Sequence, residues 1–289
     1  MDARLQRRIQ RYGWDRAVDF YDQCWLSRLL PATRSVLERA AIAPGDRVLD
    51  VACGTGVLAI AAAARVGKNG SVTGIDLSAK MVEAAQTAAR ALGLDNCRFE
   101  RGDAEALPDL GGEFDVGLCG LGLMYMPDPE RALVVLAQQL VPGARVAVSV
   151  WGQRSRCAWA DIFPIVDARV ESEVCPLFFR TGAGDTLHHA LDAAGLSGVT
   201  TERLSVTLRY VSADEACDAA FLGGPVALAY SHFDAATRAA VRAEYLQSVE
   251  SYRRGEAYAI PGEFVVGYGV KPATGRKHSA VTSAERGSP

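Results

Sequence analysis

The chain has 289 residues, of which 49% are hydrophobic and 22% are charged. These values are ordinary for globular proteins and exclude a disordered chain, a collagen-like chain and a coiled coil. The 31 Lys and Arg residues against 34 Asp and Glu residues give a net charge of -3. A chain with this balance has no general attraction to nucleic acid or to an anionic membrane, so we expect no nucleic-acid partner.

The longest near-apolar run, Val57–Val66, is much shorter than the roughly 20 residues that a membrane-spanning helix needs. The N-terminus also lacks the continuous apolar stretch of a secretory signal. The seven cysteines are odd in number and no two are separated by two residues, which argues against a zinc site and against a disulfide framework. We therefore expect a cytoplasmic protein with free thiols, no metal and no integral membrane association.

From residue 47 onward, short β-rich runs alternate with helical stretches, which is the pattern of a mostly parallel sheet covered on both faces. Ser78 is a candidate cap for a helix that ends at Gly93, and Asp128 followed by Pro129 opens another helix. The expected strands of this α/β domain are residues 47–52, 71–75, 98–101, 114–119 and 145–151.

In the second half of the chain, strand and helix patterns alternate less regularly. We expect helices over residues 158–170 and 186–194 and strands over residues 202–210 and 263–270. The segment between these two strands is too long and too apolar for a hairpin turn, and its pattern predicts a helix over residues 235–252. The expected division of the chain is an N-terminal helical lid (1–40), a core (41–211 and 259–271), a helical insertion (212–258) and a disordered tail (272–289).

The strongest chemical signal is the run VLDVACGTG at residues 48–56, a buried strand that leads into a glycine turn and an apolar helix. Gly54 and Gly56 allow a tight turn and a close approach of a ligand to the helix N–H groups. The turn alone also fits a dinucleotide-binding fold. Asp50 argues against that interpretation, because its carboxylate would repel a pyrophosphate and suits a cationic ligand end.

Two more carboxylates follow the next two strands. Asp76 lies about 20 residues after Gly56, where a carboxylate can accept hydrogen bonds from both hydroxyls of a ribose that has no 2′-phosphate. Asp103 follows the third strand and can accept a hydrogen bond from an exocyclic amine such as that of adenine. Together, the three acids describe an adenosine that is joined to a charged amino acid.

These motifs resemble those of the class I S-adenosylmethionine-dependent methyltransferases, of the branch that includes ubiquinone and menaquinone C-methyltransferases. The resemblance covers residues 47–151, including the stretches 114–116, 122–125, 127–129 and 140–143. It implies a Rossmann-like, mostly parallel sheet of seven strands with an antiparallel last strand, helices on both faces, an N-terminal helical lid and a helical insertion before the last strand. The implied cofactor is S-adenosylmethionine, with S-adenosylhomocysteine as its product.

The resemblance also implies residue roles at the cofactor. In this family Ala often stands at the first glycine position of the motif, as Ala52 does here. Tyr21 belongs to an aromatic segment that resembles the lid over the cofactor's carboxylate end. The implied cofactor-binding residues are Tyr21, Asp50, Ala52, Gly54, Gly56, Asp76, Leu77, Met81, Asp103, Ala104 and Cys119.

The expected reaction is an in-line transfer of the methyl group to oxygen or carbon of a small, partly apolar acceptor, such as a quinone or a polyketide-like phenol. An amine or thiol acceptor, a nicotinamide-dependent oxidoreductase and a non-catalytic cofactor-binding protein are the alternatives. His188, His189 and His232 are candidate catalytic bases, although a surface or capping role explains each more simply. Because acceptor pockets are mostly apolar, the expected pocket residues are Met124, Trp159, Phe178, Phe179 and Tyr230. The sequence carries no signal for an oligomeric state.

Overall fold

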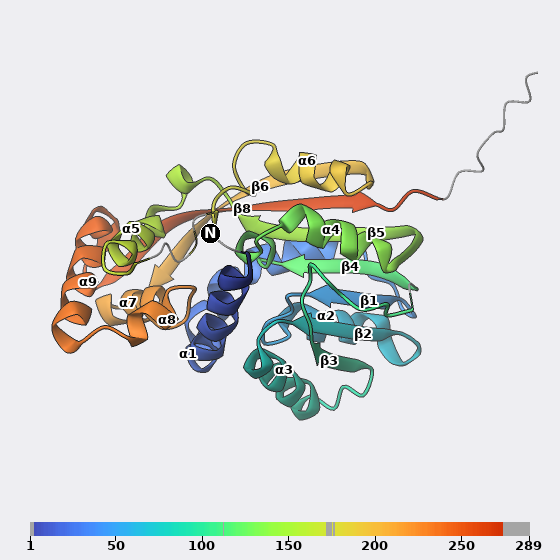
Figure 1. Cartoon of the computed structure of the whole chain (residues 1–289), viewed down its shortest axis with the longest axis horizontal. Coiled ribbons are helices and arrows are strands. Elements are labelled where there is room, and N and C mark those ends of the chain that lie inside the picture. Colours follow the sequence, from blue (N-terminus) through green and yellow to red (C-terminus); the bar gives the residue numbers. More distant parts are fainter. Residues whose placement is uncertain (1–2, 112, 172–174, 176, 274–289) are drawn as a thin grey trace, which may run out of the picture.

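The structure, a computed structural model, describes residues 3–111, 113–171, 175 and 177–273. Seven of its strands lie side by side in the order β3-β2-β1-β4-β5-β8-β6 (Figure 1). Their bounds are β1 (Arg47–Val51), β2 (Ser71–Asp76), β3 (Cys97–Arg101), β4 (Phe114–Gly120), β5 (Leu140–Trp151), β6 (Ser197–Tyr210) and β8 (Ala257–Val270).

The first five strands are parallel, and β8 runs antiparallel between β5 and β6. The expected Rossmann-like sheet with an antiparallel last strand is therefore confirmed. The described chain adds one short strand that the sequence did not predict, β7 (Arg253–Arg254), which pairs with the start of β8. Because of this hairpin, β8 begins at Ala257 and not at residue 263, so the helical part of the insertion ends earlier than expected.

Helices α3 and α4 begin at the predicted capping residues. Ser78 accepts a hydrogen bond from the Met81 amide at 3.1 Å, and Asp128 accepts one from the Arg131 amide at 2.9 Å, which satisfies N–H groups at two helix starts. The helix bounds are α1 (Ala3–Arg39), α2 (Val57–Val66), α3 (Ala79–Ala91), α4 (Pro129–Gln138), α5 (Ile162–Asp167), α6 (Thr186–Ala193), α7 (Ala213–Phe221), α8 (Ala227–Ser231) and α9 (Ala235–Ser248).

Two predicted helices are shorter than expected. The segment predicted as a helix over 158–170 is a 3₁₀ turn followed by α5, and the Arg169 side chain closes α5 by donating a hydrogen bond to the Ile165 carbonyl at 2.6 Å. Helix α9 ends at Ser248, and a 3₁₀ turn over Glu250–Tyr252 follows it. Of the tail predicted to be disordered, residues 274–289 lie outside the described residues.

The sheet separates two hydrophobic cores, because successive strand residues point to opposite faces. Val48 packs with α2, α3 and the C-terminal end of α1, whereas its neighbour Leu49 packs in the core that α4 and α6 cover. Figure 1 shows these helices on both faces of the sheet, with α5, α7, α8 and α9 grouped at one end of it. The site described below lies where this group meets the sheet and α1.

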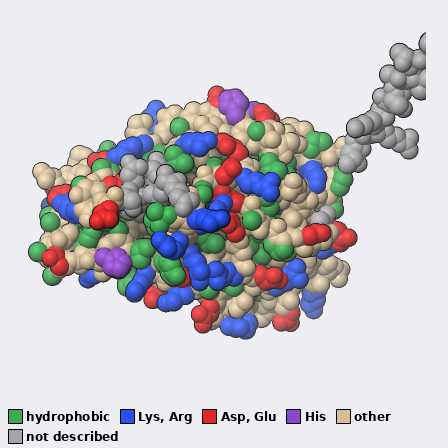
Figure 2. Space-filling view, viewed as in Figure 1, with side chains coloured by type: hydrophobic (Ala, Val, Ile, Leu, Met, Phe, Trp, Pro, Cys, Tyr) green, Lys and Arg blue, Asp and Glu red, His purple; other side chains and the backbone are tan. Residues whose placement is uncertain are grey.

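Charged side chains of both signs are interspersed over the face in Figure 2, with a group of Lys and Arg near its middle. The hydrophobic side chains on this face are scattered among them. No helix in the part of the chain that the structure describes is both long and apolar enough to span a membrane.

One buried cation joins α1 to the insertion. The Arg28 guanidinium donates hydrogen bonds to the Arg209 carbonyl at 2.7 and 3.0 Å and to Glu215 Oε1 at 2.7 Å. Its Cζ atom also lies 4.1 Å from the centre of the Tyr210 ring. Because the Arg28 side chain is only 7% exposed, these partners replace the water that it loses on folding.

We expect Arg28→Ala to lower the free energy of unfolding by about 3 kcal/mol, because it leaves buried acceptors without a donor. Urea unfolding measures this loss. Arg39→Ala is a matched control on the same helix, since its pair with Glu202 is solvent-exposed and such pairs contribute about 1 kcal/mol or less. Equal losses in the two variants would contradict the role assigned to Arg28.

Candidate functional site

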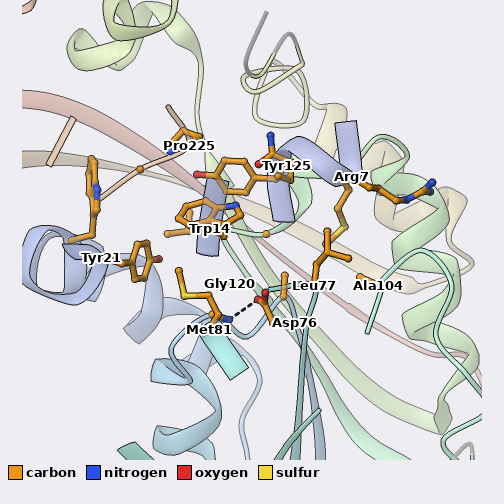
Figure 3. A pocket seen from close by; sticks show the side chains of 18 of the residues that line it. Arg7, Trp14, Tyr21, Asp76, Leu77, Met81, Ala104, Gly120, Tyr125 and Pro225 are labelled. Atoms are coloured by element: carbon orange, nitrogen blue, oxygen red, sulfur yellow. Dashed lines mark hydrogen bonds between the residues drawn. The ribbon is translucent and has the colours of Figure 1, made fainter. Parts of the chain in front are cut away.

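A cavity follows the carboxyl ends of five neighbouring strands, β3, β2, β1, β4 and β5, in that order (Figure 3). The loops after these strands supply Gly102–Glu105, Asp76 and Leu77, Ala52 and Gly54, Gly120–Gly122, and Trp151. The cavity encloses about 1020 Å³ when its open mouth is included. It lies where the strand order reverses between β1 and β4, which is the usual ligand position in open parallel sheets.

The glycine turn after β1 forms the floor of the cavity. Gly54 and Gly56 have φ values of 56° and 87°, a left-handed region that glycine adopts without strain. Ala52 also has a positive φ of 54°. Gly56 has a packing role as well, because a Cβ atom there would lie 3.0 Å from Ala85 and from the Phe99 ring.

Asp50 lies on β1 beneath this turn and is fully buried. Neither of its carboxylate oxygens has a hydrogen-bond partner among the residues that the structure describes. Burial, and then the charge of Asp76, raise the pKa of Asp50 to about 8, which the nearby backbone N–H of Ala59 on α2, not aligned for a hydrogen bond, counters only in part. A buried carboxylate without a partner fits a ligand that brings its own cation.

Asp76 ends β2 and lines the main cavity. Its Oδ2 atom accepts a hydrogen bond from the Gly54 amide at 2.9 Å, which is the bond drawn at Asp76 in Figure 3, and its Oδ1 atom accepts one from the Ser78 amide at 2.8 Å. These bonds lower the pKa of Asp76, but burial outweighs them and the pKa is raised. Each carboxylate oxygen can accept further hydrogen bonds, so the two bonds orient the group toward the cavity without saturating it.

Asp103 and Glu105 follow β3, and Arg7 of α1 bridges them. The Arg7 Nε atom lies 3.0 Å from Asp103 Oδ2, and its Nη2 atom lies 2.7 Å from Glu105 Oε2. Burial raises the pKa of Glu105, and the Asp128 amide and Arg7 oppose that rise. The other carboxylate oxygen of Asp103, Oδ1, accepts a hydrogen bond from the Glu105 amide at 2.9 Å, so both oxygens already have a partner, which the sequence did not predict.

Helix α1 contacts the loops after β1, β2 and β3 in turn. Asp22 accepts a hydrogen bond from the Thr55 hydroxyl at 2.7 Å, and Asp15 accepts one from the Ser78 hydroxyl at 2.6 Å. With the Arg7 pair, these contacts hold one face of the helix along the cavity. The residues of α1 that line it recur at helical spacing and are Arg7, Gln10, Trp14, Tyr21, Trp25 and Leu29.

The opposite end of the cavity is aromatic. Trp151 and Trp159 lie with ring centres 4.8 Å apart, and Trp25 lies 6.0 and 6.1 Å from them. The loop Gly223–Pro225 of the insertion completes this end, and Tyr125 lies between the two ends (Figure 3). The charged side chains of the described cavity lining, Arg7, Asp76, Asp103 and Glu105, all belong to the other end.

Most of the predicted cofactor residues lie together in the structure. Asp50 lies in a smaller, adjoining cavity that also contains Tyr21, Ala52 and Gly54. Gly56 and Cys119 are outside both linings, because Gly56 packs on α3 and the Cys119 side chain is fully buried while the next residue, Gly120, reaches the cavity. The residues that line the main cavity are Tyr21, Ala52, Gly54, Asp76, Leu77, Met81, Asp103 and Ala104.

The expected acceptor residues are less well placed. Trp159 lines the cavity, but Met124, Phe178 and Tyr230 are buried in the core, and Phe179 borders a separate surface hollow. Met124 packs inward because it lies in the single 3₁₀ turn Leu123–Tyr125, where consecutive side chains point in different directions.

The three candidate bases lie outside the cavity lining. His188 is half-exposed on α6 and pairs with Asp192 at 3.3 Å, one helical turn farther along. His189 and His232 are exposed. The structure therefore brings none of the three to the cavity, and a role as a base stays an untested prediction.

Several lining residues were missed from the sequence. Arg7 and Trp14 are two of them, although with the predicted Tyr21 they recur every seven residues, a spacing that indicates one helix face. Tyr125 lies beside the predicted Met124 in the same motif. Trp151 ends a predicted strand, where a side chain reaches the ligand edge of the sheet.

Comparisons with known proteins agree with this geometry. The family model described as a methyltransferase domain matches residues 42–172. Nocamycin O-methyltransferase of Saccharothrix syringae is 29% identical over 283 residues, which cover 92% of this chain and 98% of that protein. The 2-phytyl-1,4-naphtoquinone methyltransferase of Synechococcus elongatus is 41% identical over 119 residues, which cover 40% of this chain and only half of that relative.

A solved structure shows the same fold. Phospholethanolamine N-methyltransferase 2 of Haemonchus contortus, in complex with phosphomonomethylethanolamine and S-adenosylhomocysteine, superposes with a TM-score of 0.58 at 15% identity. The superposition covers 89% of this chain and 57% of that one. With the strand order and the glycine turn, these matches show an S-adenosylmethionine-dependent methyltransferase with the class I fold.

Proposed function

We propose that this enzyme methylates oxygen or carbon of a small, partly apolar acceptor of the quinone or polyketide-phenol kind. The observation that carries the proposal is the division of the cavity into a charged end and an aromatic end. An apolar, aromatic wall favours a planar acceptor, and the described lining offers no charged side chain there to hold a charged amine. Two relatives whose names include a naphtoquinone and nocamycin support this choice.

The charged end fits the cofactor from one end to the other. Asp50 would bind the ammonium group of its methionine part, because it is a buried carboxylate that lacks a partner. Asp76 would accept the ribose hydroxyls, and Asp103 with Ala104 would contact the adenine. Tyr21, which borders both cavities, would cover the carboxylate end.

The bound cofactor supplies an activated methyl group on a positively charged sulfur. The residues of this chain then have to align the acceptor with that group and to exclude water. Helix α1 and the loop Gly223–Pro225 cover the aromatic end for this purpose. Alignment of this kind contributes up to roughly 7–11 kcal/mol in well-oriented intramolecular reactions, so a dedicated base is unnecessary for an acceptor that loses its proton readily.

Incubation with methyl-labelled S-adenosylmethionine tests the proposal. Acceptors are offered in two groups: 1-naphthol and 1,8-dihydroxyanthraquinone as phenols, and benzylamine and thiophenol as an amine and a thiol. We expect label on the phenols. Label on benzylamine or thiophenol alone would favour the N- or S-methylation alternative. A further incubation contains the small molecules of a cell extract, and cofactor binding without transfer of label to any of them or to the four compounds would favour a non-catalytic protein.

Asp76→Ala should weaken S-adenosylmethionine binding roughly 100-fold or more, because it removes the charged acceptor for two ribose hydroxyls. Isothermal titration calorimetry measures the change. Asp95→Ala, at an exposed loop position, is the control and should bind like the wild type. Unchanged affinity in the Asp76 variant would refute the ribose assignment.

Asp50→Asn should weaken cofactor binding while it stabilises the unbound protein. The pKa of Asp50 is about 8 in the folded chain and has a reference value of 3.8, so the folded state holds a proton that the unfolded state releases. The stability from this group is therefore present at low pH and is lost as pH rises toward 8, by up to about 1.4 kcal/mol per pH unit.

Urea unfolding of the unbound protein between pH 5 and 8 measures this effect. The difference in unfolding free energy between Asp50→Asn and the wild type should grow with pH in favour of the variant. Asp95→Asn, at an exposed position, should show no such growth. A constant difference across the range would show that Asp50 is ionised throughout.

Alanine variants at His188, His189 and His232 should keep kcat within about twofold of the wild type, because their side chains lie outside the cavity lining. Steady-state kinetics with the phenol that accepts label measures this. A tenfold loss in any one variant would restore that histidine as a candidate base.

A further inference from the structure

Tyr125 has a fixed place in the middle of the cavity wall. It ends the 3₁₀ turn after β4, and its amide donates a hydrogen bond to the Gly122 carbonyl at 3.1 Å. Its ring packs edge-on between two other rings, with centre distances of 4.9 Å to Trp14 and 5.3 Å to Phe178. The ring is therefore held from α1 on one side and from the core on the other.

The hydroxyl of Tyr125 points into the cavity. Figure 3 shows it directed away from Arg7, toward the end that Pro225 borders. The hydroxyl has no hydrogen-bond partner within the described ranges of the chain. It differs from the unpartnered polar atoms of the core, which are sealed from solvent. Since a buried tyrosine hydroxyl ordinarily finds a partner, this one is available to a ligand.

Two other polar atoms at this end are less available. Trp25 Nε1 already donates to the Ala219 carbonyl at 3.1 Å. Trp159 Nε1 is sealed from solvent. The hydroxyl of Tyr21 also faces the cavity, but the proposed function assigns Tyr21 to the carboxylate end of the cofactor. Tyr125 therefore offers a hydrogen-bond donor that an acceptor at the aromatic end can reach.

The Tyr125 hydroxyl stays protonated. Burial raises its pKa well above the usual range, and the neighbouring Cys175 and Tyr21 raise it further. These two titratable groups face it from the loop before α6 and from α1, and both are neutral near pH 7, because burial raises the pKa of Cys175 to about 12 and also raises that of Tyr21. A neutral donor in an apolar site binds an oxyanion more strongly than a neutral oxygen.

We propose that Tyr125 positions the acceptor by donating a hydrogen bond to an oxygen that carries negative charge in the reacting form, so that the enzyme selects phenols and enols that bind as their anions. This inference rests on the proposed function. The acceptor O–H proton goes to solvent water before or during binding. An electron pair of the anion then forms the bond to the methyl carbon, while the carbon–sulfur bond breaks and its electrons neutralise the sulfonium.

The test uses Tyr125→Phe, which keeps the ring contacts and removes the hydroxyl. Tyr12→Phe is the matched control, because Tyr12 lies on α1 outside the cavity lining and is 47% exposed. Each protein is saturated with S-adenosylhomocysteine, whose affinity is measured first by calorimetry and should differ by less than twofold between variants. The probes are 4-nitrophenol and 2-hydroxy-1,4-naphthoquinone, whose acid and anion forms absorb at different wavelengths.

We expect the anion of each probe to bind roughly 10- to 100-fold more weakly to Tyr125→Phe than to the wild type, with an upward shift in the pKa of the bound probe. Tyr12→Phe should match the wild type. With an acceptor that turns over, the acid limb of the kcat–pH profile should move to higher pH in Tyr125→Phe, a change that a merely structural role would not produce.

The outcomes separate the two proposals. If the wild type does not bind S-adenosylhomocysteine, the cofactor assignment is wrong. Intact cofactor binding with the same probe affinity and probe pKa in Tyr125→Phe would overturn the role of Tyr125 alone. Failure of both probes to bind the saturated wild type would overturn the selection of anionic phenols and enols.

Discussion

The contacts between α1 and the loops after β1, β2 and β3 decide the shape of the site. A parallel sheet brings its strand ends to one edge, but an edge alone is open to water. Asp22 and Asp15 bind hydroxyl groups of two of these loops, and Arg7 neutralises the acids of the third. These contacts turn an open edge into a covered cavity, so the helix that begins the chain is as much a part of the site as the glycine turn.

The same arrangement produces a gradient of polarity along the cavity. Acids lie at or near the ends of β3, β2 and β1, whereas β5 ends in Trp151, against which Trp25 and Trp159 pack. A reaction between a charged cofactor and an apolar acceptor needs this separation, because a charged group beside the acceptor would retain water. The raised pKa of Asp50 in the unbound chain is consistent with this separation, because the carboxylate is buried without a partner until it binds a cation.

The sequence predicted the sheet and the positions of the glycine turn and Asp76 well because these depend on local signals. A buried strand followed by Gly54 and Gly56 has few backbone solutions, and Asp76 at the end of the next strand is brought to the same edge by parallel pairing. The caps at Ser78 and Asp128 were also correct, since capping involves residues three apart. Element ends were predicted less well, as at α5, which ends at Asp167, and at β8, which begins at Ala257 after its pairing with β7.

The position of α1 over the cavity and the orientation of the acceptor residues depend on contacts between distant residues, which a single sequence does not reveal. Arg7 meets Glu105 across 98 positions and Arg28 meets Glu215 across 187. Within one turn, Met124 points into the core while its neighbour Tyr125 points into the cavity, and only the packing of Trp14 and Phe178 against the Tyr125 ring makes that choice. The sequence therefore indicated which aromatic residues lie near the site but did not indicate the direction of their side chains. Because the orientation of one hydroxyl can decide which acceptor is held, specificity in this enzyme depends on the part of the structure that local sequence patterns determine least.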